Sequence, residues 1–283
     1  MIVVTGASGQ LGRLVIDSLL ARMPAGQIVA AVRNPERVAD LAALGVQVRQ
    51  ADYNQPDSLV RAFAGADKVL LISSSEVGQR VPQHAAVITA AQQAKVKLLA
   101  YTSLLHADRS PLGLAAEHQQ TEALLRDSGL PVVLLRNGWY TENYLASIPS
   151  ALEHGVLLGS AGEGRIASAA RADYAEAAAI VLTRDQQAGL VYELAGDSGY
   201  TLAELAAEIS RHAGRTIPYQ DLPQGEFQSI LLGAGLPEGL AQMLADSDTG
   251  ASKGGLFDDS KVLSKLIGRP TTPLAKVLAD AIA

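Results

Sequence analysis

Residues 1–12 read MIVVTGASGQLG, and this stretch decides the fold class. The apolar run Ile2–Thr5 has the composition of a parallel strand buried on both faces. It leads into a GxxGxxG turn, whose glycines allow a tight bend and let backbone N–H groups approach a pyrophosphate. Apolar residues at helical spacing follow the turn. This order of strand, glycine turn and helix predicts the first βα unit of a dinucleotide-binding domain.

The same alternation of strand and helix continues along the chain. The predicted strands are Ile2–Thr5, Ile28–Val32, Val46–Ala51, Lys68–Ser73, Lys97–Thr102, Val132–Arg136 and Val191–Ala195. The first predicted helix lies between the first two strands, where Leu11, Leu14, Val15, Leu19 and Leu20 recur at helical spacing. The other predicted helices are Pro35–Leu44, Pro56–Phe63, Pro82–Ala94, Ala115–Ser128 and Arg171–Thr183. Strands alternating with helices predict an α/β fold, a doubly wound parallel-sheet Rossmann domain with right-handed crossovers.

The alternation weakens after Gly138, where a Gly-rich stretch and later helix-like segments predict a smaller C-terminal substrate subdomain. We assign residues 1–138 plus about 167–196 to the dinucleotide-binding Rossmann domain. Residues about 139–166 plus 197–283 form the substrate-facing subdomain. Asp246–Ser260 is rich in Asp, Ser and Gly, and we interpret it as an exposed connection because it lacks the ligand order of a calcium loop.

Composition narrows the classes of function. The 283 residues include 48% hydrophobic residues and carry a net charge of −6, which suits a globular protein and gives no basic surface for nucleic acid. The absence of cysteine excludes disulfides, a thiolate nucleophile and Cys-ligated metals. The scattered histidines predict no metal site. With no leader pattern and no long apolar run, we expect a cytoplasmic protein without membrane partners, either a monomer or a homodimer.

The end of the second predicted strand indicates which dinucleotide is bound. NAD-selective folds place an acidic residue there for the ribose 2′-hydroxyl, whereas this chain has Arg33. A guanidinium favours a 2′-phosphate, so we predict NADPH as cofactor, with NADH possible but weaker. Asp52 and Tyr53 end the third strand and either flank the adenine or serve as a helix cap and a surface aromatic.

Small polar residues end the later strands. A doubly wound sheet binds ligands at the carboxyl ends of its strands. We therefore expect the ligand crevice to be lined by Ser73, Ser74 and Ser75, by Thr102 and Ser103, and by the run Asn137–Tyr140. Each segment alone is also compatible with ordinary turn chemistry, and Ser103 also fits a hydroxyl that caps the strand end.

These residues together resemble the NmrA-like atypical short-chain dehydrogenase/reductases. The resemblance rests on GASGQLG, Arg33-Asn34, LRNGWYTEN at Leu135–Asn143 and the tail LIGRPTTPL. More narrowly, ISSSEVGQR, AYTSLLHAD and ADSDTGASKGGLFDDSK resemble the bacterial type 2 NADPH:quinone oxidoreductases and the triphenylmethane reductases. The resemblance implies a Rossmann domain that holds NADPH, a smaller domain that covers the acceptor, and no flavin between them.

The resemblance also implies roles for individual residues. Phosphate contacts fall to Gly6, Ala7, Ser8, Gly9, Gln10 and Leu11; 2′-phosphate recognition falls to Arg33, and ribose-side contacts to Ser73, Ser74 and Ser75, with Ser103 as a secondary contact. Nicotinamide contacts fall to Asn137, Gly138, Trp139, Tyr140, Thr141 and Glu142. Asn143 closes this motif and would face the acceptor.

The chain departs from carbonyl-reducing relatives, which carry Tyr-x-x-x-Lys on the helix after the fifth strand. The helix here reads Leu114-Ala115-Ala116-Glu117-His118, so the proton donor that an alkoxide needs is missing. Quinones and triarylmethyl cations accept hydride without that donor. We therefore predict a flavin-free reductase of quinones or similar planar electrophiles, with Trp139 and Tyr140 as packing walls and Asn143 as a polar anchor.

Several alternatives stay open at this point. Trp139 fits a core position as well as a substrate contact. His118 and Glu122, four residues apart, fit a proton relay, but we favour a surface or cap-side pair. The fold also suits a redox sensor that binds NADP(H) without turnover, or a triphenylmethane dye reductase. Isomerase or epimerase chemistry is disfavoured because it needs the missing Tyr/Lys pair.

Overall fold

The computed structural model describes residues 1–282 and divides the chain into two compact units. The larger unit combines Met1–Leu104, Ala116–Arg136 and Arg171–Tyr192. The smaller unit combines Leu105–Ala115, Asn137–Ala170 and the chain from Glu193 onward. Each unit is therefore built from segments that lie far apart in the sequence.

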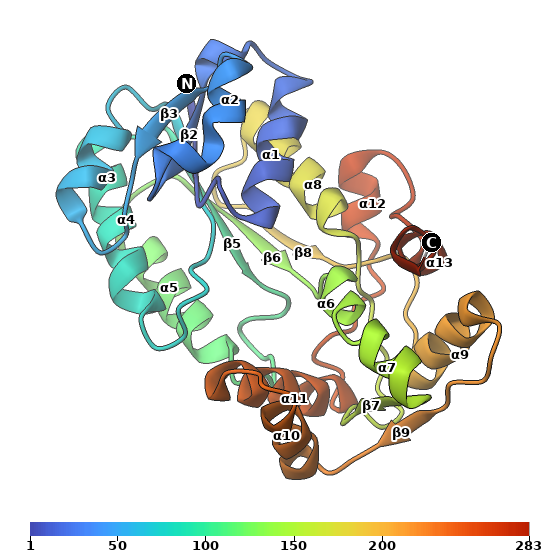
Figure 1. Cartoon of the computed structure of the whole chain (residues 1–283). Coiled ribbons are helices and arrows are strands. Elements are labelled where there is room, and N and C mark those ends of the chain that lie inside the picture. The colour runs from blue at the N-terminus through green and yellow to red at the C-terminus, as the bar shows by residue number, and fades with distance from the viewer. Residues whose placement is uncertain (283) are drawn as a thin grey trace. The chain divides into compact units, whose positions relative to one another are not determined.

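A seven-stranded sheet with helices on both faces organises the larger unit (Figure 1). The strands are β1 (Ile2–Thr5), β2 (Ile28–Val32), β3 (Gln47–Gln50), β4 (Lys68–Leu71), β5 (Leu98–Leu104), β6 (Val132–Asn137) and β8 (Val191–Leu194). The helices are α1 (Gln10–Leu20), α2 (Ala39–Ala43), α3 (Pro56–Ala62), α4 (Arg80–Ala94), α5 (Ala115–Asp127) and α8 (Arg171–Thr183), with short 3₁₀ turns η1 (Ala25–Gln27) and η2 (Pro35–Val38). Helices α1 and α8 pack together on one face, and α3 and α4 on the other.

The strand order β3-β2-β1-β4-β5-β6-β8 confirms the predicted doubly wound sheet. Strand β1 pairs in parallel with β2 on one side and β4 on the other, so the order reverses between β1 and β4. Every residue of β1, β2 and β5 is buried, as expected for strands covered on both faces. Ligands of such sheets bind at the carboxyl ends of the strands where the order reverses.

The predicted strands agree with the observed ones to within two residues at each end. Between β4 and α3 the core is built from Val69, Leu71, Leu59 and Phe63, all fully buried. These apolar strand residues are the ones whose pattern predicted the sheet. The helix that was predicted as Pro35–Leu44 divides into η2 and α2.

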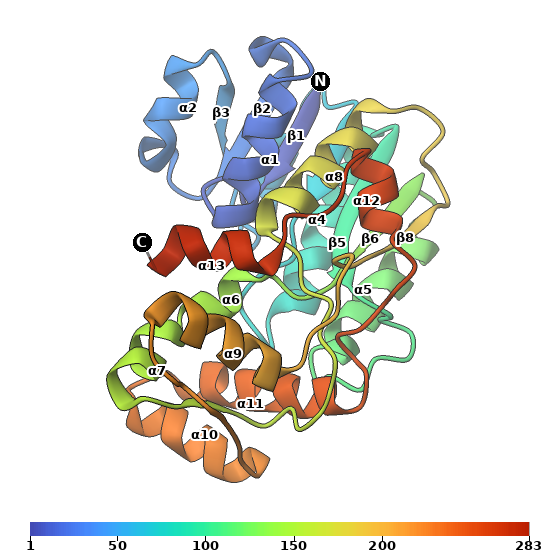
Figure 2. The same cartoon turned by 90° about the vertical axis from the view of Figure 1, so that its right-hand side faces the viewer.

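The smaller unit is mainly helical (Figure 2). It contains α6 (Glu142–Leu145), α7 (Ile148–His154), α9 (Leu202–Ala213), α10 (Gln224–Gly233), α11 (Glu238–Ser252), α12 (Val262–Ile267) and α13 (Leu274–Ile282). Strands β7 (Leu157–Gly159) and β9 (Tyr219–Asp221) pair in parallel as a separate two-stranded sheet. Helix α13 packs against α9 and α6, and α10 against α11. Helix α9 begins with a complete capping box between Thr201 and Glu204.

The prediction that Asp246–Ser260 is an exposed connection was wrong for its first half. Residues up to Ser252 continue helix α11, and Asp248 is buried. The Asp248 carboxylate accepts a hydrogen bond of 3.0 Å from the backbone N–H of Ser160. Burial raises the pKa of Asp248 to about 6. The small and acidic residues that indicated a loop instead lie on a helix, where tertiary packing outweighs their weak helix propensity.

Candidate functional site

The turn after β1 requires its glycines for different reasons. Gly6 has a φ of +59°, in the left-handed region that only glycine adopts freely. At Gly12, a Cβ atom would lie 2.4 Å from the carbonyl oxygen of Gly6 and 2.7 Å from the Cα of Ala7. A side chain at Gly12 would therefore separate helix α1 from the turn. Gly9 closes the bend by donating its N–H to Gly6 O at 2.9 Å.

Helix α1 begins directly after this turn without a side-chain cap. Its N-cap residue is Gly9, and no side chain accepts a hydrogen bond from the first N–H groups. These groups and the helix dipole favour an anion at this end. The arrangement is the one by which dinucleotide-binding domains hold a pyrophosphate.

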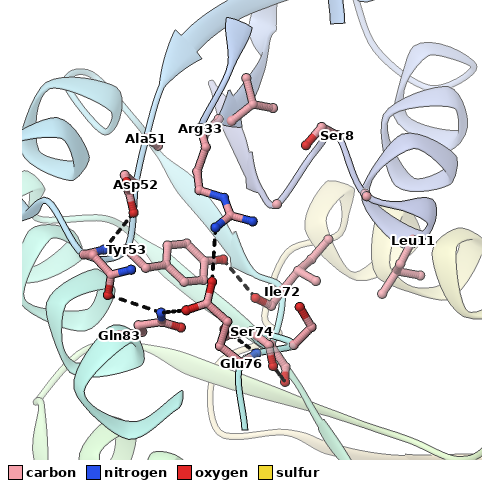
Figure 3. A pocket seen from close by; sticks show the side chains of 18 of the residues that line it. Ser8, Leu11, Arg33, Ala51, Asp52, Tyr53, Ile72, Ser74, Glu76 and Gln83 are labelled. Carbon is pink, nitrogen blue, oxygen red and sulfur yellow. Dashed lines mark hydrogen bonds and ion pairs between the residues drawn. The ribbon is translucent and has the colours of Figure 1, made fainter. Parts of the chain in front are cut away.

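A pocket of about 280 Å³ lies in front of the turn (Figure 3). Ligand sites usually measure about 300–1,000 Å³, so this space suits one part of a dinucleotide. The residues that line it come from the carboxyl ends of four neighbouring strands, from the turns after them, and from helices α1 and α4: Gly6, Ser8, Gly9, Gln10, Leu11, Gly12, Ala31, Val32, Arg33, Ala51, Asp52, Tyr53, Asn54, Ile72, Ser73, Ser74, Ser75, Glu76 and Gln83. The geometry therefore fits the adenosine and phosphate part of a dinucleotide.

Most of the predicted cofactor contacts in this unit surround that pocket. Gly6, Ser8–Leu11, Arg33 and Ser73–Ser75 all line it. Ala7 does not, because its side chain is fully buried beneath the turn. Ser103 is also outside the pocket lining and lies buried in β5. The binding roles of these residues stay predictions.

Asp52 and Tyr53 both line the pocket, and their hydrogen bonds explain how they are held. The Asp52 carboxylate accepts the N–H of Asn54 at 2.9 Å. The Tyr53 hydroxyl donates to Ile72 O at 2.9 Å and shares a hydrogen bond with Thr5 Oγ1 at 2.5 Å. Burial raises the pKa of Tyr53. Tyr53 is therefore a fixed wall of the pocket.

Arg33 points across the pocket toward an acidic residue (Figure 3). Its Nη1 lies 3.1 Å from Oε1 of Glu76, which belongs to the turn after β4. Gln83 of α4 donates from Nε2 to Oε2 of the same carboxylate at 2.8 Å. The sequence did not single out Glu76 or Gln83, since their approach to Arg33 depends on strand order.

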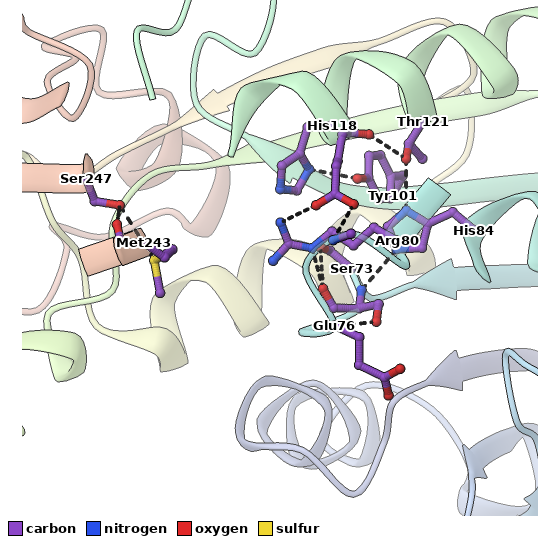
Figure 4. A network of polar contacts seen from close by, with 12 residues as sticks. Ser73, Glu76, Arg80, His84, Tyr101, His118, Thr121, Met243 and Ser247 are labelled. Carbon is purple, nitrogen blue, oxygen red and sulfur yellow. Dashed lines mark hydrogen bonds and ion pairs between the residues drawn. The ribbon is translucent and has the colours of Figure 1, made fainter. Parts of the chain in front are cut away.

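A buried polar network that includes Arg80, His84, Tyr101, His118 and Thr121 contacts the turn after β4 (Figure 4). His84 Nε2 accepts the N–H of Ser74 at 2.9 Å, so Nδ1 carries the proton and donates to Thr121 Oγ1 at 2.9 Å. Thr121 in turn donates to Glu117 O at 2.9 Å. The chain of hydrogen bonds fixes the Ser74 backbone against helices α4 and α5.

Arg80 supplies the positive charge of this network. Its Nε donates to Ser74 O at 2.5 Å, and its Nη1 lies 3.6 Å from Oε2 of Glu117. Burial, followed by the charge of Arg80, lowers the pKa of His84 to about 4. Burial, followed by the charges of Arg80 and His84, lowers the pKa of His118 to about 3. Both histidines are therefore neutral at physiological pH.

The interpretation of His118 and Glu122 as a surface or cap-side pair was wrong. His118 is buried, and its Nδ1 lies 2.7 Å from the hydroxyl of Tyr101. Glu122 accepts from Arg136 at 2.9 and 2.7 Å and from Ser103 Oγ at 2.6 Å. The spacing of four suggested a solvated pair, but α5 turns this face toward the sheet. Each residue therefore has a separate buried partner.

The motif Asn137–Asn143 belongs to the smaller unit and is held largely by its backbone. Gly138 donates to Leu194 O at 2.7 Å, and Thr141 donates to Ala169 O at 2.9 Å. The Thr141 hydroxyl bonds Ser168 at 2.8 Å, and the Asn143 N–H bonds Tyr140 O at 3.0 Å. The motif is therefore a fixed segment.

Burial varies along this motif. Trp139 is 7% exposed, which suits a core position, whereas Tyr140 and Asn143 are partly exposed. Glu142 begins α6, in which none of the four residues is fully buried. The assignment of these residues to nicotinamide and acceptor stays a prediction.

Comparison with known proteins places the chain in a family. Residues 6–185 match the family described as NAD(P)H-binding. The chain belongs to the NAD(P)H-binding family. The match covers the glycine turn and the strands that follow it, so binding of a nicotinamide dinucleotide is a property of the family to which these residues belong.

Several named proteins resemble this chain over its whole length. It is 63% identical over 276 residues to quinone oxidoreductase 2 of Escherichia coli, covering 98% of this chain and 96% of that protein. The crystal structure of the NADPH-dependent quinone oxidoreductase QOR2 of Escherichia coli with NADPH superposes with a TM-score of 0.98 at 61% identity, covering 100% of both chains. Triphenylmethane reductase of Citrobacter sp. with NADP(H) gives 0.95 at 40% identity, covering 99% and 100%.

Metal clusters and membrane-spanning helices are both absent from the part of the chain that the structure describes. Within residues 1–282, no group of three or more His, Asp or Glu residues is placed to hold a metal ion. No described helix combines the length and apolar character that crossing a membrane requires.

Proposed function

We propose that this member of the NAD(P)H-binding family is an NADPH-dependent reductase that passes hydride to a quinone or a similar planar electrophile. The observation that carries the proposal is full-length similarity, at 63% identity, to quinone oxidoreductase 2, together with Arg33 at the pocket. The larger unit holds the cofactor and the smaller one faces the acceptor.

The residues of the larger unit fit an NADPH molecule. The uncapped start of α1 and the close approach of Gly12 to the turn leave backbone N–H groups for the pyrophosphate. Arg33 supplies a guanidinium for a 2′-phosphate, and Tyr53 a wall for the adenine. When bound, NADPH supplies the hydride, and no flavin or metal is needed between donor and acceptor. NADH is a weaker cofactor because it lacks the 2′-phosphate that Arg33 would bind.

The choice of acceptor follows from the absence of a proton donor. Helix α5 carries no Tyr/Lys pair, and its two titratable candidates have other partners: neutral His118 contacts Tyr101, and Glu122 pairs with Arg136. Reduction of an isolated ketone needs such an acid. A quinone becomes a weakly basic hydroquinone anion, which water protonates. The chain then acts by positioning, with Trp139 and Tyr140 as walls and Asn143 as a polar anchor.

A triarylmethane dye is the second candidate acceptor. The similarity to triphenylmethane reductase, at 40% identity over nearly the whole chain, favours it. A triarylmethyl cation becomes neutral on accepting hydride and requires no proton. One acid-free site therefore suits both planar acceptors.

The proposal is tested by mixing the purified protein with NADPH and a simple benzoquinone, without added flavin, and following the loss of nicotinamide absorbance. Matched reactions contain NADH, a triarylmethane dye or no protein. Faster oxidation of NADPH than of NADH supports the proposal. Tight NADPH binding without oxidation by either acceptor would instead indicate a redox sensor.

A pair of variants tests the role of Arg33. Arg33→Met should raise the KM for NADPH about tenfold or more and leave the KM for NADH nearly unchanged, because only the phosphate contact is removed. Arg37→Met removes an equal charge from η2, outside the pocket lining, and is the matched control. Equal effects of the two variants would assign the change to general electrostatics.

A further inference from the structure

Glu76 presents a carboxylate to the guanidinium that the proposed function reserves for a phosphate. Oε1 of Glu76 lies 3.1 Å from Nη1 of Arg33 across the pocket (Figure 3). Both side chains line the pocket, with Glu76 41% and Arg33 67% exposed. Exposed ion pairs of this kind are weak, so a stronger anion can displace this carboxylate from Arg33.

The carboxylate is also held independently of Arg33. Gln83, which is buried, donates from Nε2 to Oε2 of Glu76 at 2.8 Å and to Asn54 Oδ1 at 3.2 Å. The backbone N–H of Glu76 donates to Ser74 Oγ at 3.1 Å. Glu76 is therefore anchored from the wall of α4 and from its own turn. Its negative charge stays at the pocket when Arg33 turns toward a ligand.

An acid at this place affects the two dinucleotides in opposite ways. The carboxylate repels a 2′-phosphate because both are negatively charged, and the phosphate must also displace the carboxylate from Arg33. A ribose 2′-hydroxyl, in contrast, is a donor that a carboxylate accepts well, which is why NAD-selective folds place an acid at the end of the second strand. Here Arg33 holds that position and the acid comes from the turn after β4.

We propose that Glu76 is a specificity-determining residue that moderates the preference for NADPH. It competes with the 2′-phosphate for Arg33 and accepts the 2′-hydroxyl of NADH. This inference rests on the proposed binding of NADPH in this pocket. The site therefore contains one side chain that favours each dinucleotide: Arg33 favours NADPH and Glu76 favours NADH. Gln83 holds Glu76 in place.

The test measures cofactor binding, by titration calorimetry of the purified protein with NADPH and NADH in the absence of any acceptor. Glu76→Gln should lower the Kd for NADPH about threefold and raise the Kd for NADH about threefold, within the range of exposed ion pairs and single hydrogen bonds. Glu36→Gln is the matched control, because it removes the same charge from an exposed residue of η2 outside the pocket lining.

Two fragments that lack the nicotinamide locate the effect at the adenosine end. Adenosine 2′,5′-diphosphate, which stands for NADPH, should bind Glu76→Gln more tightly than wild type, and adenosine 5′-monophosphate, which stands for NADH, should bind it more weakly. The inference is overturned if Glu76→Gln changes the ratio of NADPH affinity to NADH affinity by less than about twofold, or lowers it. The proposed function would remain intact in that case. A wild-type protein that binds neither dinucleotide overturns both. An equal rise in the ratio for Glu36→Gln also overturns the inference.

Discussion

The glycine turn and the buried polar network lie near each other in the larger unit but are built in different ways. The turn occupies seven consecutive residues, Gly6–Gly12, and works through backbone shape. The network joins side chains of α4, β5 and α5, among them Arg80, Tyr101 and His118. The turn offers open N–H groups to a ligand, whereas the network uses its polar groups to fix the protein itself. Binding and support are thus separate tasks.

The ion pair between Glu122 and Arg136 gives the largest expected effect. Arg136→Met should lower the free energy of unfolding by about 3–4 kcal/mol, because the Glu122 carboxylate, whose side chain is only 12% exposed, would lose its guanidinium while staying largely removed from solvent. Denaturant unfolding measures the change. The double variant Arg136→Met/Glu122→Gln should recover part of it, since no uncompensated charge remains. A loss of less than about 1 kcal/mol in the single variant would place this pair in effectively solvent-like surroundings.

The turn should be almost as sensitive, but through shape. Gly12→Ala should lower the free energy of unfolding by about 3 kcal/mol, because the new Cβ would lie 2.4 Å from a backbone oxygen that cannot move aside easily. Gly26→Ala is the control, since its Cβ would meet no atom within 4 Å. Similar thermal unfolding of the two variants would contradict the close packing of α1 on the turn.

The network also predicts a pH dependence. His84 and His118 have folded pKa values of about 4 and about 3, below the ordinary 6.5, so the unfolded state binds more protons in this range. Their contribution to stability is complete above pH 6.5 and is lost as the pH falls toward 4. Between about pH 7.5 and pH 5, each should contribute a loss of about 2 kcal/mol.

The variant His118→Asn checks this assignment, because its amide can still contact Tyr101 but does not titrate. Unfolding measured at both pH values should show a smaller pH dependence than wild type. An unchanged slope would mean that other groups cause the acid sensitivity.

A buried acid in the smaller unit should show the opposite sign and a smaller effect than the two histidines together. The pKa of Asp248 is raised from 3.8 to about 6, so its folded state favours the protonated form and stability falls as the pH rises through this range. Asp248→Asn should stabilise the protein by about 2 kcal/mol more above pH 7 than near pH 4, as measured by denaturant unfolding at both pH values. Glu238→Gln removes a carboxylate from the exposed start of the same helix and is the matched control. The same stabilisation in both variants would point to the overall charge of the helix instead of the burial of Asp248.

The sheet and the pocket could be predicted because their signals are local. A buried strand such as Ile28–Val32 is recognisable from its own residues, and the position of Arg33 follows from the end of that strand. Strands β7 and β9 were not predicted, since three residues around Leu158 form a strand only when paired with the segment at Gln220. The fold class therefore needed no knowledge of distant contacts.

The buried network could not be predicted in the same way. Its partners, such as Tyr101 and His118, are 17 residues apart, and polar side chains normally indicate a solvated face. One signal was available: His118 shares a helical face with Thr121 and Leu125, both buried. Leu125, the apolar residue on that face, indicates which side of α5 packs on the sheet.

The missing cap of helix α1 has a consequence for the protein in the cell. Its first N–H groups lack a side-chain acceptor, so the pyrophosphate of a bound dinucleotide would complete the helix. A ligand that binds only the folded state adds stability in proportion to the logarithm of its concentration. Cellular proteases should therefore degrade this protein more slowly when the dinucleotide concentration is high and faster when it is low.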